Sequence, residues 1–304
     1  MGARIMKIAI VGDPHITEYI RERQDNYLQA VLRKLEYIAD NNDKVILLGD
    51  VFDKPTNSDY LFYRVYSLMK RHEGKFIAIL GNHDIIHHNY DQLNKTTIGS
   101  LAKTGVLQVM TKDFTLGGLD FVVSLCRRDM CEIPVDETNK KILLGHNYYE
   151  MDEAESFTHD ELAKLNYNLV FLGHDHKPYE DMYVGHSILI RMGSLTRKDT
   201  QVYNETRDIR YVRLDSNTGE YEYVYLPEDI ALPSSCVFYA DSFGKKTIQR
   251  IQINYAEISK LLEKFSKQGQ GNVSLLNVLK RIKTPKANID YIKNLHELAG
   301  LKFN

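Results

Sequence analysis

The stretch that decides the fold lies at residues 45–53, Val45-Ile46-Leu47-Leu48-Gly49-Asp50-Val51-Phe52-Asp53. Four aliphatic residues closed by a glycine are typical of a buried β-strand. Two aspartates follow this strand directly. The stretch therefore predicts a strand whose carboxyl end carries side chains that can bind a metal ion.

The same arrangement occurs five times in the first 176 residues. Apolar runs at 7–11, 45–48, 76–80, 142–144 and 169–172 each end in a polar cluster. The other four clusters are Gly12-Asp13-Pro14-His15, Gly81-Asn82-His83-Asp84, Gly145-His146 and Gly173-His174-Asp175-His176. In layered α/β sheets, ligands bind beyond the carboxyl ends of the strands. We therefore expect the five clusters to meet in space.

Helical patterns lie between these strands. The apolar residues of 28–38 share one helical face, and those of 61–69 share another. Thr158 and Glu161 form a capping box ahead of a third helix. Alternation of strand and helix predicts an α/β fold with a layered sheet.

The pattern changes after residue 200. Residues 209–214 and 221–226 alternate apolar and polar residues around Asn217-Thr218-Gly219, which predicts a β-hairpin. A further strand is expected at 248–253 and helices from 255 onward. We therefore divide the chain into a catalytic domain (1–200), a small β-rich cap (201–254) and a basic C-terminal helical region (255–304).

Composition and charge exclude several classes of protein. The formal charge of −2 argues against a purely electrostatic nucleic-acid binder, although residues 245–304 carry 12 Lys/Arg against 4 Asp/Glu. Three cysteines without C-x-x-C spacing form neither a disulfide framework nor a thiolate zinc site. The apolar run at 8–11 is too short for a signal peptide or a membrane span. A cytoplasmic location, in a bacterium or a phage-infected host, is expected.

The five clusters together supply the ligands of a dinuclear metal centre. A pair of metal ions needs several ligands and a bridging carboxylate. Two carboxylates, four imidazoles and one amide oxygen are available in Asp13, His15, Asp50, Asn82, His146, His174 and His176. Imidazole and carboxylate ligands without thiolates suit Mn, Fe or Zn better than Ca. We expect two divalent ions, Mn²⁺ first, with Fe, Zn and Mg as alternatives. Six other histidines are assigned to the surface or the core: His72, His87, His88, His159, His186 and His296.

The order D-x-H, G-D-x-x-D, G-N-H-D, G-H and G-H-x-H resembles the calcineurin-like metallophosphoesterase superfamily over about residues 7–195. The resemblance implies a β-sandwich flanked by helices. It also implies that Asp13, His15, Asp50 and His176 hold one metal and that Asp50, Asn82, His146 and His174 hold the other, with Asp50 bridging.

The resemblance also implies catalytic roles for two residues. His83 is expected to act as general acid toward the leaving oxygen or to stabilise the transition state, and Asp84 to orient and polarise His83. Asp53 is interpreted as a turn-forming carboxylate.

Finer features resemble the SbcD-like DNA repair nucleases. They are the residues 49–55 (Gly-Asp-Val-Phe-Asp-Lys-Pro), an arginine (Arg21 or Arg23) before Asp25, and Gly193-Ser194 with Arg197 beyond. Thr17 departs from that family, which usually has glycine there. The size of the chain resembles compact phage-encoded members. This resemblance implies a DNA exo- or endonuclease with an SbcC-like coiled-coil ATPase partner, and homodimerisation is left open.

Basic residues after the last cluster are candidate DNA contacts: Arg191, Arg197, Lys198, Arg207, Arg210 and Arg213. A solvated charged face is the alternative for some of them. Two other functions remain open. One is a stand-alone phosphatase or phosphodiesterase for a small molecule or a protein. The other is a non-enzymatic scaffold, against which the complete ligand set argues.

Overall fold

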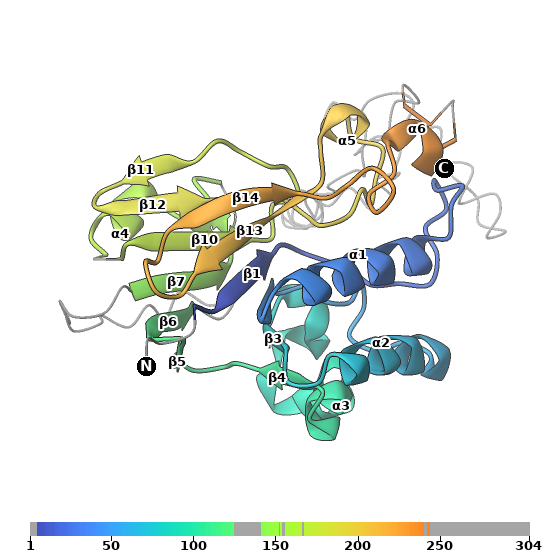
Figure 1. Cartoon of the computed structure of the whole chain (residues 1–304), viewed down its shortest axis with the longest axis horizontal. Helices are drawn as coiled ribbons and strands as arrows, with labels where there is room; N and C mark the ends of the chain where they lie inside the picture. The colour runs from blue at the N-terminus through green and yellow to red at the C-terminus, as the bar shows by residue number, and fades with distance from the viewer. Residues whose placement is uncertain are drawn as a thin grey trace, which may run out of the picture. The chain divides into compact units, whose positions relative to one another are not determined.

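Two six-stranded mixed sheets lie face to face in the computed structural model (Figure 1). The structure describes residues 5–124, 141–151, 153, 156–165, 167–239 and 242–243. The first sheet has the order β14-β13-β1-β2-β3-β4, and the second has the order β11-β12-β10-β7-β6-β5.

The first sheet has a parallel centre. It consists of β1 (Lys7–Val11), β2 (Lys44–Leu48), β3 (Phe76–Ile79) and β4 (Leu107–Val109). At its other edge, β13 (Arg210–Asp215) pairs antiparallel with β1, and β14 (Tyr221–Tyr225) pairs antiparallel with β13. The parallel strands point their carboxyl ends in one direction, toward the same edge of the sheet.

The second sheet repeats this design. Its parallel strands are β6 (Leu119–Ser124), β7 (Lys141–His146), β10 (Leu169–Gly173) and β12 (Ser187–Ile190). Antiparallel edges are formed by β5 (Phe114–Leu116) and β11 (Met182–Val184). A separate two-stranded ladder joins β8 (Tyr148–Tyr149) and β9 (Ser156–Phe157).

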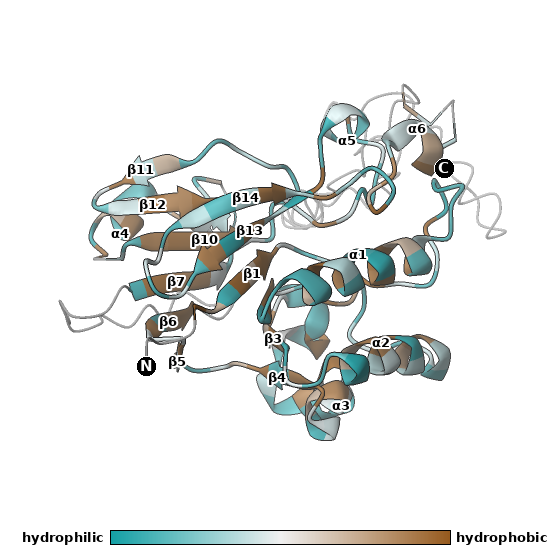
Figure 2. Cartoon of the chain, in the orientation of Figure 1, coloured by the Kyte–Doolittle hydropathy of each residue, from teal (hydrophilic) through white to brown (hydrophobic). Residues whose placement is uncertain are grey.

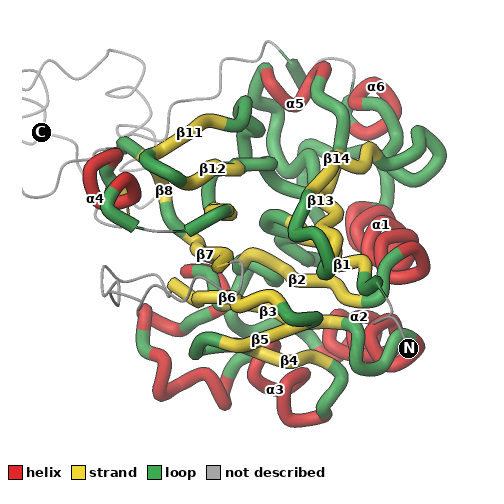
Figure 3. The backbone as a smooth tube through the Cα atoms, turned by 60° about the vertical axis from the view of Figure 1, so that its left-hand side comes forward, coloured by secondary structure: helices red, strands yellow, loops and turns green. Residues whose placement is uncertain are grey.

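Three helices cover the outer face of the first sheet, α1, α2 and α3 (Figure 3). These are α1 (Tyr27–Asn41), α2 (Asp59–Arg71) and α3 (Thr97–Thr104). The short α4 (His159–Ala163) packs on the second sheet, and α5 (Tyr203–Thr206) and α6 (Ser234–Val237) follow later. Short 3₁₀ helices occupy Asn82–Asp84, Ile86–His88 and Tyr90–Lys95. Within the described residues, every helix is too short or too polar to span a bilayer.

Period-two alternation along the strands separates two apolar layers. On β1, Ile8 and Ile10 face the second sheet, whereas Ala9 and Val11 face the helices. The inner layer is completed by residues such as Phe121 from the second sheet. Because both faces of these strands are buried, they are apolar along their length, and Figure 2 shows β1, β7 and β10 mainly in the hydrophobic colour. The predicted α/β sandwich flanked by helices is confirmed.

The predicted elements of the catalytic part are also confirmed. All five apolar runs are strands, and the two long helical patterns are α1 and α2. The capping box of Thr158 and Glu161 begins α4.

The region predicted as a β-rich cap contains the predicted hairpin. The hairpin at 209–226 forms, and β13 pairs with β1, so that the hairpin extends the first sheet. Pairing with β13 covers what would otherwise be a free strand edge. The strand expected at 248–253 and the helices expected from 255 onward lie outside the described residues.

Candidate metal centre

Five loops at the carboxyl ends of β1, β2, β3, β7 and β10 build one cluster of side chains. The register places the strand ends side by side, with Val11 opposite Leu47, Leu48 opposite Ile79 and Gly173 opposite His146. The loops after β1 and β2 are joined further, because the backbone N–H of His15 donates to the carbonyl of Asp50 at 2.9 Å. The predicted convergence is therefore a consequence of strand register.

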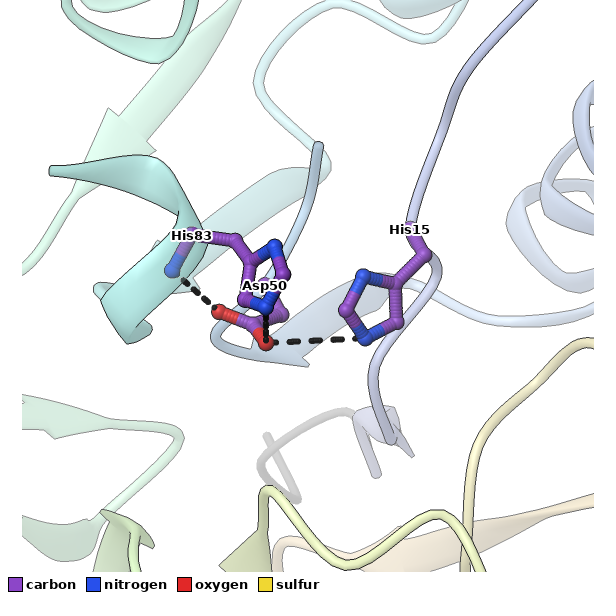
Figure 4. Close-up of side chains that lie close together, drawn as sticks. All are labelled: His15, Asp50 and His83. Atoms are coloured by element: carbon purple, nitrogen blue, oxygen red, sulfur yellow. Dashed lines mark hydrogen bonds and ion pairs between the residues drawn. The ribbon is translucent and has the colours of Figure 1, made fainter. Parts of the chain in front are cut away.

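One half of the cluster lies around Asp50 (Figure 4). Nε2 of His15 is 3.5 Å from Oδ2 of Asp50, and Nε2 of His83 is 4.0 Å from the same oxygen. The backbone N–H of His83 donates to the other carboxylate oxygen of Asp50 at 2.9 Å. His176 completes this half, since its Nε2 lies 2.7 Å from Nε2 of His15.

The other half shares the same carboxylate. Nε2 of His146 lies 3.3 Å from Oδ2 of Asp50, 3.1 Å from Oδ1 of Asn82 and 3.1 Å from Nδ1 of His174. Asp50 thus stands between two groups of donors. This is the position that a bridging ligand requires.

Asp13 lies beside His146 and His174 and has a buried oxygen without a partner among the described residues. Its Oδ1 accepts the backbone N–H of His174 at 2.9 Å and lies 3.4 Å from Nδ1 of His146. Its Oδ2 is buried, and no described residue hydrogen-bonds to it. A buried carboxylate oxygen without a partner is costly unless a cation satisfies it.

The spacing of the donor atoms fits divalent metal ions. Ligand atoms about 2.0–2.2 Å from a metal, at tetrahedral or octahedral angles, lie roughly 3 Å from one another. Several of the facing donor atoms described above are separated by such distances. The residues present therefore fit two ions, and the seven predicted ligands are all part of this one cluster.

The backbone of the ligand loops is strained. Asp13, His15, Asp50 and His174 have φ angles of 38°, 46°, 44° and 83°. Residues with side chains avoid this left-handed region, at a cost of about 1–2 kcal/mol each. Four such residues among seven ligands indicate that the loops are held in place to aim these side chains.

Two glycines lie so close to predicted ligands that a side chain would not fit at either position. Gly49 adopts a φ of 79°, and a Cβ there would lie 2.5 Å from Nδ1 of His146. A Cβ on Gly81 would overlap the carboxylate of Asp50. Glycine is thus required at both positions because a Cβ would overlap a neighbouring side chain, and at Gly49 also because of its positive φ angle.

Burial and mutual charge set the pKa values in the cluster. Burial raises the pKa of Asp13 to about 7. Burial also acts on Asp50 and His146, but their mutual attraction outweighs it, lowering the pKa of Asp50 and raising that of His146 to about 10. Burial lowers the pKa of His174 to about 3. A neutral imidazole such as His174 is the form that binds a metal.

Asp53 has a larger role than the predicted turn. Its Oδ1 lies 3.5 Å from Nδ1 of His15, and its backbone carbonyl accepts Nδ1–H of His83 at 2.8 Å. Lys198 forms an ion pair with the same carboxylate and lies 3.3 Å from Nδ1 of His15. The second aspartate of G-D-x-x-D was the sequence feature that could have predicted this role. A histidine that binds a metal through one ring nitrogen usually donates the N–H of the other to a carboxylate.

The ring of His83 has its hydrogen bond with the carbonyl of Asp53 and not with Asp84, which was predicted to orient it. Its buried carboxylate instead accepts the backbone N–H groups of Val51, Phe52 and Gly81 at 3.1–3.3 Å. The short 3₁₀ helix at 82–84 turns the Asp84 side chain back toward the β2 loop. Asp84 therefore ties the Asp50 loop to the His83 loop.

A cleft of about 310 Å³ opens onto the centre. Its wall includes Asp50, His83, His174 and His176, together with Tyr148, Asp175, Lys177, Tyr179, Gln201 and Tyr203. The ring of Tyr148 lies 4.0 Å from the ring of His174, centroid to centroid. The side chain of His83 is 39% exposed, so this imidazole can meet a substrate in the cleft.

The predicted DNA contacts have different surroundings. Arg197 and Arg207 donate to backbone carbonyls, Arg197 to that of Leu232 and Arg207 to that of Ser194, both at 2.8 Å. These guanidinium groups therefore hold loops together, and neither lines the cleft, although Arg207 lies 5.6 Å from the ring centroid of Tyr203 on its wall. Lys198 is engaged by Asp53.

The other predicted cations lie against tyrosine rings or at a strand edge. Arg191 lies 3.9 Å from the ring centroid of Tyr179, and Arg210 lies 3.7 Å from that of Tyr223. Arg213 pairs with Glu222 at 3.0 Å. Two of these cations contact Tyr179 of the cleft wall: Arg191 stacks on its ring, and Arg210 donates to its carbonyl at 3.4 Å.

Comparison with solved structures finds shorter proteins at low sequence identity. TT1561 of Thermus thermophilus is 14% identical, with a TM-score of 0.45, over 73% of this chain and 99% of that one. A hypothetical protein from Pyrococcus horikoshii is 13% identical, with a TM-score of 0.40, over 74% of this chain and 90% of that one. No curated protein sequence matches the chain.

The comparison with protein families gives a clear assignment. Residues 6–178, more than half of the chain, match the calcineurin-like phosphoesterases. The matched segment contains all seven predicted ligands, together with His83, Asp84 and Asp53. The chain therefore belongs to the calcineurin-like phosphoesterase family.

Proposed function

We propose that this member of a family of metal-dependent phosphoester hydrolases is a phosphodiesterase that cleaves DNA, as an exo- or endonuclease. The observation that carries the proposal is the cluster of predicted ligands around the shared Asp50, open on one side to a cleft of about 310 Å³. Two groups in it, His15 with Asp50 and His83, and Asp50 with His146 and His174, have ligand atoms close enough together to hold a metal ion. Family membership supplies the reaction class, and the cleft supplies the argument for the substrate.

The residues around Asp50 account for the steps that the protein itself performs. Two divalent ions, when bound at such a centre, supply positive charge to the phosphate oxygens and generate a nucleophile from water. Nδ1–H of His83 is held by the carbonyl of Asp53. The imidazolium form of His83 therefore carries its second proton on Nε2 and can give that proton to the leaving oxygen. Asp53 also orients His15, and Asp84 fixes the two loops on which Asp50 and His83 stand.

The wall of the cleft favours a nucleic acid over other phosphoesters. Three tyrosines, Tyr148, Tyr179 and Tyr203, lie on the wall beside the centre, and bases stack on such rings irrespective of sequence. Lys177 lies on the same wall, with Nζ 5.1 Å from the ring centroid of Tyr179. Its ammonium group is placed to neutralise a phosphate next to the scissile one. Arg191 supports the Tyr179 ring from 3.9 Å.

The identity of the metal and of the partners belongs to the same proposal. Mn²⁺ is proposed as the native ion because histidines and carboxylates ligate without thiolates. The proposed partner is an SbcC-like coiled-coil ATPase, and the basic sequence after residue 244 is its proposed contact, with a homodimer as the alternative assembly. The proposed location is the cytoplasm.

The test is a Mn²⁺-dependent nuclease assay on single- and double-stranded DNA ends, with a small aryl phosphodiester in parallel. It is run with and without the ATPase encoded beside the gene. We expect DNA cleavage that disappears with chelator and falls in Lys177→Ala, whereas the exposed Lys112→Ala behaves as wild type. Hydrolysis of the aryl phosphodiester with DNA left intact at all salt concentrations would refute the nuclease and favour the stand-alone phosphodiesterase.

A further inference from the structure

A second cavity, of about 160 Å³, lies beside the first turn of α1 and is lined by none of the seven ligands. Four cationic side chains line it: Arg23, Arg33, Lys34 and Arg197. The carboxylates on the wall are Asp25 and Asp229. The lining therefore has two more positive than negative charges.

Two of the four cations already have carboxylate partners. Arg23 binds Asp25 through two parallel hydrogen bonds, from Nε at 2.7 Å and from Nη2 at 2.6 Å. Arg33 lies 3.6 Å from Asp229, and both side chains are more than half exposed. The excess charge therefore belongs to Lys34 and Arg197.

Lys34 and Arg197 are buried, with 3% and 5% of their surfaces exposed, and neither forms an ion pair with any described residue. Nζ of Lys34 makes one long hydrogen bond, 3.4 Å, to the carbonyl of Leu195. Arg197 donates from Nη1 to the carbonyl of Leu232 and from Nη2 to that of Arg207, and its buried Nε has no partner among the described residues. Burying a charge without a counter-charge is costly.

The pKa values reflect the same lack of negative charge. Burial, together with the neighbouring guanidinium groups, lowers the pKa of Lys34 well below its usual value and lowers that of Arg197. An anion in the cavity would remove this penalty.

The helix adds to the positive potential. Asn26, the N-cap of the 15-residue α1, and Gln29 in its first turn line the same cavity. The N-terminus of a helix carries about half a positive charge and favours anions, phosphate groups above all.

We propose that this cavity binds a phosphate group. Guanidinium, ammonium and a helix N-terminus together form the usual setting for a phosphate. The volume equals about five waters at roughly 30 Å³ each, which suits one phosphate group and little more. The group is either free inorganic phosphate or the terminal phosphate of a nucleic-acid strand. The site is independent of the metal centre and of the proposed nuclease activity.

The test measures phosphate binding by the full-length protein in excess chelator, by calorimetry and by the shift of the unfolding temperature, at constant ionic strength in chloride. Wild type should bind phosphate, and Lys34→Met should weaken binding by about tenfold or more. Arg33→Gln, at the rim, should weaken it less. The exposed Lys112→Met and the metal-centre variant His176→Ala should bind as wild type does.

Each outcome decides the proposal. The proposal would be overturned if the wild type bound no phosphate at concentrations up to about 10 mM, which corresponds to a binding free energy weaker than about 3 kcal/mol. Unchanged binding in Lys34→Met would also overturn it, as would loss of binding in His176→Ala, which would place the phosphate at the metal centre. The unfolding temperature in chloride shows whether each variant is folded. Competition by a 5′-phosphorylated oligonucleotide, but not by its unphosphorylated form, would identify a strand end as the source; no competition would identify the free ion.

Discussion

The carboxylate of Asp53 faces Nδ1 of His15 at 3.5 Å, while Nε2 of His15 faces Asp50 at the same distance. His15 is therefore held between two aspartates of one motif, G-D-x-x-D. Burial acts to raise the pKa of Asp53, but hydrogen bonding from His15 and Lys198 lowers it below its usual value. Asp53 is thus a charged group that fixes the orientation and the tautomer of a metal ligand.

Asp53→Ala should weaken metal binding by about 10- to 100-fold, because His15 loses the carboxylate that orients it. Titration with Mn²⁺ followed by calorimetry measures the affinity. Asp53→Asn, which keeps the shape, should recover part of the loss. The matched control is Asp59→Ala, an exposed residue in the first turn of α2, and an equal loss in both variants would contradict the role of Asp53.

His83→Ala should lower kcat by about 100- to 10,000-fold and leave metal affinity unchanged, because its ring contributes a proton and not a required ligand. Steady-state kinetics and a metal titration of the same preparation measure the two effects. Turnover at the wild-type rate would exclude His83 as the acid, and loss of metal would make it a ligand.

Gly81→Ala should displace Asp50 and lower metal affinity by about 100-fold, because the added methyl group overlaps the bridging carboxylate. Gly74→Ala is the control, since no atom lies within 4 Å of its Cβ site. That variant places a side chain at a φ of 77° and should cost about 1 kcal/mol of stability without affecting the metal. Unaltered metal binding by Gly81→Ala would disprove the steric account.

Metal affinity should fall as the pH falls, because protons compete for the ligands. His146, with a pKa of about 10, is protonated at neutral pH, so each binding event displaces its proton. Asp13, with a pKa of about 7, adds a second proton below pH 7. The metal affinity should therefore fall by about tenfold for each pH unit of acidification above pH 7, and more steeply below pH 7. Calorimetry in two buffers of different ionisation enthalpy counts the protons, and no release between about pH 6 and 8 would contradict this prediction.

Lys34→Met should raise the free energy of unfolding at pH 7 by about 1 kcal/mol or more, because it removes a buried charge without a partner. The pKa of Lys34 is lowered in the folded protein from its usual value of 10.5. At a pH between the lowered pKa and 10.5, Lys34 is therefore protonated in the unfolded chain but not in the folded protein. The free energy of unfolding of the wild type should therefore rise with pH across this pH range. The advantage of Lys34→Met should then shrink toward pH 10.5, as urea unfolding in phosphate-free buffer can measure. A constant advantage would mean that packing, not charge, is the cause.

The sequence by itself determined the strands, the main helices and the set of residues at the metal centre. Fully buried parallel strands must be apolar along their length, so the runs ending at Val11, Leu48 and Gly173 are visible without coordinates. The residues that follow them share one edge of a sheet, which predicts that Asp13, Asp50 and His174 converge.

Only the tertiary structure decided which residues support those ligands and which cations remain without a counter-charge. Asp53 and Asp84 are both aspartates near a ligand, yet one orients His15 and the other holds three backbone N–H groups. Arg197 was a plausible DNA contact, but its guanidinium is buried against carbonyls. The hairpin at 209–226 was predicted, but its pairing with β1 was not. Such contacts join residues far apart in the chain, and local periodicity contains no information on them because it records burial and not partners.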